Sequence, residues 1–377
     1  MPAAADREQA IKTLIERLDA RQKSELAAYR AARVKHDAAL AAYWSNVGER
    51  RSERRRKIRA GEPVGPADYV QTFPPEYTGP KLSPAVARIW AEIERETQPP
   101  PAPIPTIEDV LASAKAVYGF VPERISEREF KWRYALEALA HGLSKEQVVR
   151  IYALETGGQG TYDMQAGINP VTGRGTPIST ALGYAQLLHA NSVNELVNHG
   201  ASFISRLETM ANAEPQRAAV LRAKAKVLRS MLQNARSVPN DWYEHMRFAG
   251  TPKGLGIHAL NIDGDVGPWL QVIKLKGIKE VGERGGRPQL APVEMELMNL
   301  AGPSTGLEMM LPIARNMPTS NFFSRQGYER NTIVRGRTAG ELLVALDKRM
   351  DENEKKPGAV EFAAVFDEAQ QQRQARR

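Results

Sequence analysis

Apolar side chains recur at helical spacing along most of this chain, and so do the segments that begin helices. A Ser or Thr that stands three positions before an acid or an amide can cap the first turn of a helix. Five segments have this pattern: Thr106–Asp109, Ser126–Glu129, Ser144–Gln147, Ser192–Glu195 and Thr338–Glu341. The alternation typical of strands is rare, and only Val266–Leu275 could form one. The pattern predicts an all-α fold.

The distribution of apolar, proline and charged residues divides the chain into four parts. Residues 1–60 are rich in Ala, Arg and Glu and end in the basic run Arg50–Lys57. They predict a basic helical arm, with a coiled coil as one option. Residues 61–106 are dominated by proline and predict a semi-rigid linker. Residues 107–350 carry most of the capping signals and predict the main domain, whereas the polar residues 351–377 predict a tail that frays.

Within the main domain, residues 212–236 predict a long helix or a helical hairpin inserted into the fold.

Composition narrows the classes of protein to which the chain can belong. No apolar run approaches the ~20 residues of a membrane-spanning helix, and no secretory signal peptide is visible after Met1. The chain has no cysteine, which excludes disulfides and thiolate zinc sites. Its formal net charge of +8 suits an anionic partner: cell-wall polymer, nucleic acid or a membrane surface.

The patterns of metal and phosphate sites are weak or missing. The six histidines form no closely spaced ligand pair, so a zinc hydrolase is not expected. Asn261-Ile-Asp263-Gly-Asp265 resembles the start of a calcium loop, but its glycine is misplaced and no Glu closes the loop. A turn with capping aspartates is therefore expected there. We expect no metal and no cofactor.

Glu155 is an acid where the local pattern favours an apolar side chain. Val148, Ile151, Tyr152 and Glu155 lie on one face of the helix that begins after Ser144. Gly157-Gly158 then end that helix. Burial and the negative end of the helix dipole both disfavour an ionised carboxylate, so Glu155 is a candidate general acid. The alternative is a structural glutamate whose carboxylate reaches solvent or a salt bridge.

The residues around and after Glu155 resemble the SLT-type lytic transglycosylases of the lysozyme-like superfamily. In that family a catalytic Glu closes a helix in an E-[ST]-G motif, matched here by Glu155-Thr156-Gly157. A Ser…G-x-x-Q-[LM] segment follows, matched by Ser179, Gly183 and Gln186-Leu187. The resemblance covers about 107–350 and is strongest over 144–190. Three later stretches look like the C-terminal helices of such domains: Asn299–Gly306, Asn321–Phe323 and Arg337–Thr338.

The resemblance implies a lysozyme-like helical domain that cleaves the MurNAc–GlcNAc bond of peptidoglycan and leaves 1,6-anhydro-muropeptides. Glu155 would be the single catalytic residue, acting first as acid and then as base. The substrate-binding residues implied are Ser179, Gly183, Tyr184, Gln186 and Asn261. Ser179 would orient the acid, and Tyr184, whose alternative role is ordinary packing, would line the cleft. Peptidoglycan glycan strands would be the partner, in the periplasm of a bacterial cell envelope.

One family motif is missing. The A-Y-N-x-G string does not occur, and its nearest counterpart places Asn261 after Leu260. This departure supports an alternative, a lysozyme-like module that binds peptidoglycan without cleaving it. A further alternative is a helical adaptor or scaffold that meets a protein partner, or itself, through the N-terminal helices. We do not expect nucleic acid as a partner, because the motifs that read bases are absent.

Overall fold

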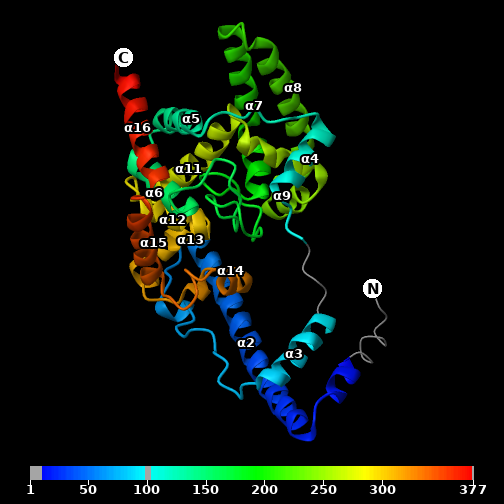
Figure 1. Cartoon of the computed structure of the whole chain (residues 1–377). Coiled ribbons are helices and arrows are strands. Elements are labelled where there is room, and N and C mark those ends of the chain that lie inside the picture. The colour runs from blue at the N-terminus through cyan, green and yellow to red at the C-terminus, as the bar shows by residue number, and fades with distance from the viewer. Residues whose placement is uncertain (1–10, 98–102, 376–377) are drawn as a thin grey trace. The chain divides into compact units, whose positions relative to one another are not determined.

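The computed structural model describes residues 11–97 and 103–375, and these residues form an all-α protein (Figure 1). The predicted all-α fold class is therefore confirmed. Extended structure in this part of the chain is limited to isolated bridges. The chain divides into two compact units. Unit 1 comprises 1–103 and 311–340, and unit 2 comprises 104–310 and 341–377.

Unit 1 is built on one long helix. Residues 11–16 are helical, and the longer elements are α2 (Ala20–Ala60), α3 (Pro84–Thr97) and α14 (Arg325–Arg330). Short 3-10 turns complete it: η1 (Pro66–Asp68), η3 (Pro312–Ala314) and η4 (Thr319–Asn321). Leu14, Leu18 and Leu26 pack with Val86 and Ile93 of α3 in a small apolar core. The predicted linker thus contains a helix that packs on the arm, while residues 98–102 of its proline run lie outside the described residues.

The basic run of α2 binds unit 1 itself. Arg54 is fully buried, and its guanidinium donates to the carbonyl oxygens of Asp68 and Asn321 and stacks on the Tyr69 ring at 4.3 Å. Arg51 donates to the carbonyl oxygens of Ser320, Asn321 and Phe323. Because guanidinium groups here satisfy buried backbone acceptors, the run joins segments that lie far apart in the sequence.

Asn321 completes this junction. Its side chain is buried, accepts the Val70 N–H at 2.8 Å and donates to the Val70 carbonyl at 2.8 Å. Residues 311–340 therefore belong with the N-terminal residues, and the predicted continuous domain over 107–350 differs from the division observed.

We expect a chain truncated to residues 104–377 to keep unit 2 folded but to leave residues 311–340 without their packing partners. The buried Asn321 side chain and the carbonyl groups that Arg51 and Arg54 satisfy would then face water. Limited proteolysis, read by mass spectrometry, should cut first within 311–340 in the truncated chain and not in the full chain. Equal protection of this segment in both chains would contradict the role assigned to the basic run.

Unit 2 holds most of the helices. They are α4 (Ile107–Tyr118), α5 (Glu127–Ala140), α6 (Lys145–Thr156), α7 (His189–Ala213), α8 (Ala218–Ala235), α9 (Trp242–Ala249), α10 (Pro252–His258), η2 (Ala259–Ile262), α11 (Val266–Arg284), α12 (Pro292–Ala301), α13 (Pro303–Met309), α15 (Ala339–Asn353) and α16 (Pro357–Ala375). Figure 1 shows α7 and α8 side by side as a helical hairpin. The segment 212–236, predicted as a long helix or a helical hairpin, corresponds to the end of α7 and to α8.

Local signals placed several helix starts correctly and one wrongly. The side chains of Thr106, Ser126 and Ser144 each cap the helix predicted to follow. Ser192 does not, because α7 has already begun at His189 and Ser192 is buried inside it. The candidate strand Val266–Leu275 is the first half of α11, which is buried on several sides and so lacks a clean helical stripe.

The predicted frayed tail at 351–377 is wrong. Helix α16 runs to Ala375 and packs against α5 and α6, with Phe362 and Phe366 fully buried. Ion pairs flank this contact, including Lys131 with Glu361 and Lys145 with Asp367. The abundance of Gln and Arg masked the apolar residues that recur at helical spacing on the buried side. Residues 376–377 lie outside the described part.

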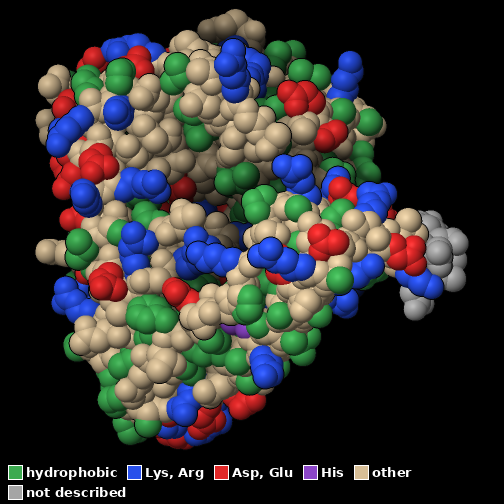
Figure 2. All heavy atoms as spheres, turned by 60° about the horizontal axis from the view of Figure 1, so that its bottom comes forward, with side chains coloured by type: hydrophobic (Ala, Val, Ile, Leu, Met, Phe, Trp, Pro, Cys, Tyr) green, Lys and Arg blue, Asp and Glu red, His purple; other side chains and the backbone are tan. Residues whose placement is uncertain are grey.

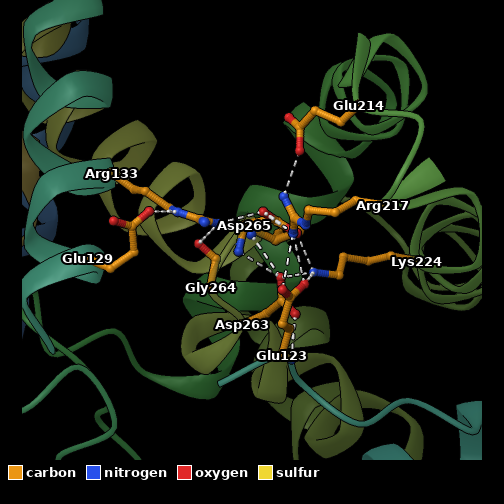
Figure 3. A network of polar contacts seen from close by, with 10 residues as sticks. Glu123, Glu129, Arg133, Glu214, Arg217, Lys224, Asp263, Gly264 and Asp265 are labelled. Atoms are coloured by element: carbon orange, nitrogen blue, oxygen red, sulfur yellow. Dashed lines mark hydrogen bonds and ion pairs between the residues drawn. The ribbon is translucent and has the colours of Figure 1, made fainter. Parts of the chain in front are cut away.

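A buried network of charges ties α8 to the turn before α11 (Figure 3). Lys224 donates from Nζ to Asp263 Oδ1 at 2.9 Å, to Asp265 Oδ2 at 2.5 Å and to Glu123 Oε2 at 3.1 Å. Arg217 adds a second cation at Asp265, at 2.8 Å. The aspartates with calcium-like spacing are thus paired with the protein's own cations, and Asp263 Oδ1 also accepts the N–H groups of Asp265 and Val266. The expected turn is observed with Asp263 as its capping aspartate, whereas the Asp265 side chain makes no capping hydrogen bond.

Charge elsewhere is dispersed. On the face in Figure 2, Lys and Arg side chains are spread among acidic and apolar ones. No helix within 11–97 or 103–375 combines the length and hydropathy of a membrane span.

Candidate functional site

Glu155 lies in the last turn of α6, as predicted. The helix ends at Thr156, and Gly157 caps it in the left-handed conformation, with φ of 65°. This conformation favours glycine and turns the chain away from the helix axis immediately after the acid. The Glu155 side chain is half-buried. Glu155 therefore retains partial access to solvent as a residue, at the end of its helix.

A second carboxyl group lies beside Glu155. Asn299, on α12, donates from Nδ2 to Glu155 Oε1 at 2.7 Å and to Glu296 Oε2 at 3.3 Å. Glu296 lies one helical turn before Asn299 on α12 and is only 1% exposed. One amide group thus bridges two carboxyl groups that are 141 positions apart in the chain (155 and 296).

The charges around this pair set its protonation. Burial raises the pKa of Glu155 to about 7, although Lys274 of α11 and hydrogen bonds to Glu296 and Asn299 act in the opposite direction. Burial and the adjacent Glu155 raise the pKa of Glu296 well above its ordinary range. Burial lowers the pKa of Lys274, while Glu155, Glu296 and Glu195 act to raise it. Near neutral pH a substantial fraction of Glu155 therefore carries a proton.

Residues 179–188 form a turn rather than a helix. Leu182 and Leu187 pair as an antiparallel bridge, and α7 begins only at His189. Gly183 has φ of 77°, and a Cβ there would lie 2.4 Å from Gln271 Nε2, so the position requires glycine. Gln186 has φ of 42°, a strained value for a residue with a side chain, and its Nε2 donates to the Gly183 carbonyl at 2.8 Å. Strain of this kind often occurs at functional sites.

Two of the substrate-binding predictions are contradicted by burial. Tyr184 is 1% exposed, and its hydroxyl donates to Glu127 inside a cluster of aromatic rings. Asn261 is fully buried, and its amide donates to Ser192 and to the His258 carbonyl. Both side chains are buried in the interior, so neither reaches a surface in this structure.

Ser179 and Asp163 also have partners of their own. The Ser179 hydroxyl accepts the Ala181 N–H at 3.2 Å within its own loop. Asp163 is the acid nearest to Glu155 in the sequence. Its carboxylate pairs with Arg124 and accepts a hydrogen bond from the Thr161 hydroxyl. The orienting contact expected from Ser179 is made by Asn299.

A pocket of about 420 Å³ opens on the loop that supports the Gly183–Gln186 turn. Asp163, Gln165 and Asn169 contribute to its lining, together with the start of α4. The Met164 carbonyl, in the same loop, accepts the Gly183 N–H at 3.0 Å. The turn and the pocket are therefore parts of one loop structure, which offers polar groups to a ligand.

Sequence reasoning missed Glu296, Lys274 and Asn299 as members of the site. Glu296 stands between Met295 and Leu297 in an apolar run, and an acid in such a run is the same signal that singled out Glu155. Asn299 opens one of the stretches that resemble the family's C-terminal helices. Lys274 has no comparable signal.

The chain was compared with protein-family models, curated proteins and solved structures, and none matches. Among the described residues, no group of three or more His, Cys, Asp or Glu could hold a metal ion.

Proposed function

We propose that unit 2 is a lytic transglycosylase that cleaves peptidoglycan glycan strands, with Glu155 as its acid and base. The observation that carries the proposal is the carboxyl group of Glu155, half-buried at a helix end, with its pKa raised to about 7 and its orientation fixed by Asn299. A general acid is most effective when its pKa lies near the working pH. The resemblance of residues 144–190 supplies the substrate class.

In the proposed reaction, Glu155 donates its proton to the glycosidic oxygen as the bond to the MurNAc anomeric carbon breaks. The bonding electrons leave with the oxygen, which becomes the hydroxyl of the departing sugar. The substrate's N-acetyl group stabilises the oxocarbenium-like centre. Glu155, now ionised, takes the proton of the sugar's 6-hydroxyl as that oxygen bonds to the anomeric carbon. The product is a 1,6-anhydro ring, and Glu155 has recovered its proton.

The position of Glu296 favours this one-acid route. Two-carboxylate glycosidases place their acids about 5–9.5 Å apart, with the sugar between them. Glu296 shares one amide with Glu155 and is 1% exposed, so it is too buried to contact a sugar. A nucleophilic role for Glu296 is therefore disfavoured.

Digestion of purified peptidoglycan, followed by mass spectrometry, tests the proposal. The expected products are 1,6-anhydro-muropeptides. Products with an ordinary reducing end would indicate hydrolysis of the same bond and contradict transglycosylase chemistry. Retention on insoluble peptidoglycan without any product would support the binding module, and neither retention nor product would support the adaptor.

The rate should depend on pH through Glu155. The first step needs the protonated acid, and a group with a pKa of about 7 loses its proton as pH rises through 7. We expect kcat/KM to fall about tenfold per pH unit above that value, with no matching loss just below it. Release of soluble muropeptides between pH 5 and 9 measures this. A rate that rises through pH 7 would indicate that the free enzyme needs the ionised form.

A further inference from the structure

The two carboxyl groups that meet at Asn299 are those of Glu155 and Glu296, and they share the charge of one lysine among the described residues. Glu155 and Glu296 each accept a hydrogen bond from the same amide nitrogen, so their side chains face each other across it. The cation that acts on both is Lys274, and Glu195 of α7 acts on that same cation. Two ionised carboxylates held this close repel strongly when they are withdrawn from water, so such a pair retains one proton between them.

Burial decides which carboxyl group keeps that proton. Glu296 is 1% exposed and lies among the apolar side chains Met295, Leu297 and Met298, which are buried with it. Glu155 is half-buried and ends its helix. The ionised form is least costly at Glu155, which is the less buried of the two and accepts the shorter hydrogen bond from Asn299, 2.7 Å against 3.3 Å. The neutral form, with an O–H to donate, therefore belongs to Glu296.

We propose that Glu296 is a positioning residue: it stays protonated, donates its hydrogen bond to the Glu155 carboxyl group and holds that group, together with Asn299, in the orientation that reacts. This inference rests on the proposed function for its kinetic consequences but not for the hydrogen bond itself. Glu296 does not touch the substrate. Its effect should therefore appear in kcat and not in KM.

Two substitutions separate the hydrogen bond from the volume of the side chain. Glu296→Gln keeps a neutral donor of similar size, and Glu296→Leu keeps the volume but removes the donor. We expect the Gln variant to retain kcat within about threefold, because an amide N–H replaces the acid O–H. We expect the Leu variant to lose about 10²-fold in kcat with little change in KM, the loss typical of a misplaced reacting group.

The titration of Glu155 provides a readout that does not need activity. The full chain is labelled with ¹³C at glutamate carboxyl groups, and Glu155→Gln identifies the Glu155 signal by its disappearance. In Glu296→Leu the Glu155 signal should titrate at higher pH than in wild type, since burial remains and a donor to the ionised form is lost. In Glu296→Gln it should titrate close to the wild-type pH. Glu195→Gln, a half-buried acid beside the same lysine, is the matched control and removes no bond to Glu155.

The outcomes are distinct. Equal Glu155 titrations in wild type and Glu296→Leu, with both variants folded by circular dichroism, would overturn the inference. If Glu296→Leu does not fold, the Gln variant decides: a Glu155 titration moved far from wild type overturns the inference, and an unmoved one supports it. Absence of anhydro-muropeptides from the wild-type chain would refute the proposed function, while the titrations would still test the hydrogen bond.

Discussion

Glu155→Gln is expected to abolish release of anhydro-muropeptides. The amide keeps the size of the side chain and its hydrogen bond to Asn299, but it has no proton of suitable acidity to transfer. General acid–base action by one group contributes about 10²–10⁴-fold, and here one group serves both steps, so the loss should reach the upper end of that range. Initial rates on purified peptidoglycan, quantified by mass spectrometry, measure the effect.

A matched control is available in the same unit. Glu127 also has a pKa raised by burial, and it accepts hydrogen bonds from Tyr184 and the Tyr162 N–H. Glu127→Gln removes a similar carboxyl group whose hydrogen bonds go to other residues, so its activity should remain within about tenfold of wild type, less than the loss from an acid–base residue. Near wild-type rates in Glu155→Gln would end the assignment of this residue as the acid.

The stability of Glu155→Gln should change in the opposite direction to its activity. The pKa of Glu155 is raised from 4.5 to about 7 in the folded chain, so the unfolded chain loses this proton first as pH rises. The wild-type free energy of unfolding therefore falls between pH 4.5 and 7. The amide does not titrate, so the variant should gain melting temperature relative to wild type across that window. A uniform loss at all pH values would indicate a structural role instead.

The sequence predicted the helical frame of the site because its signals are local. The capping box at Ser144 and the glycines after Thr156 fixed the ends of α6, and an acid on an apolar stripe marked Glu155. The partners of Glu155 come from α11 and α12, and no local pattern says which distant helix packs against which. Glu296 could have been suspected from its apolar neighbours, whereas its meeting with Glu155 is a property of the packing.

Misassigned residues have a common physical cause. Tyr184 and Asn261 belong to types that serve equally in clefts and in interiors, and burial decides between the two. By composition, the basic run in α2 suggested a charged helical arm and the polar residues of α16 suggested a tail that frays. In the structure, Arg54 is buried against backbone carbonyls and Phe362 anchors α16. Average composition says little when a few residues on one face carry the packing.

Lys224→Met is expected to cost unit 2 about 3–5 kcal/mol of unfolding free energy, the loss typical of breaking a buried ion pair on one side. Lys224 is 4% exposed, and its ammonium group is bonded to the carboxylates of Glu123, Asp263 and Asp265 (Figure 3). Methionine preserves the side-chain volume but leaves the aspartates buried with less positive charge. Lys226→Met, on the exposed side of the same helix, should change stability by less than about 0.5 kcal/mol.

Acid should reduce the cost of Lys224→Met. Burial alone would raise the pKa of Asp265, but Lys224 and Arg217 together hold it below its ordinary 3.8. Wild type therefore keeps this contribution to stability until pH falls below that value. Without Lys224 the Asp265 carboxylate takes up its proton at higher pH, which relieves its repulsion with Asp263. Urea unfolding of both chains at pH 7 and pH 5 should show a smaller difference at pH 5. A difference that is the same at both pH values, or no larger than that of Lys226→Met, would show that the network holds α8 by packing and not by charge.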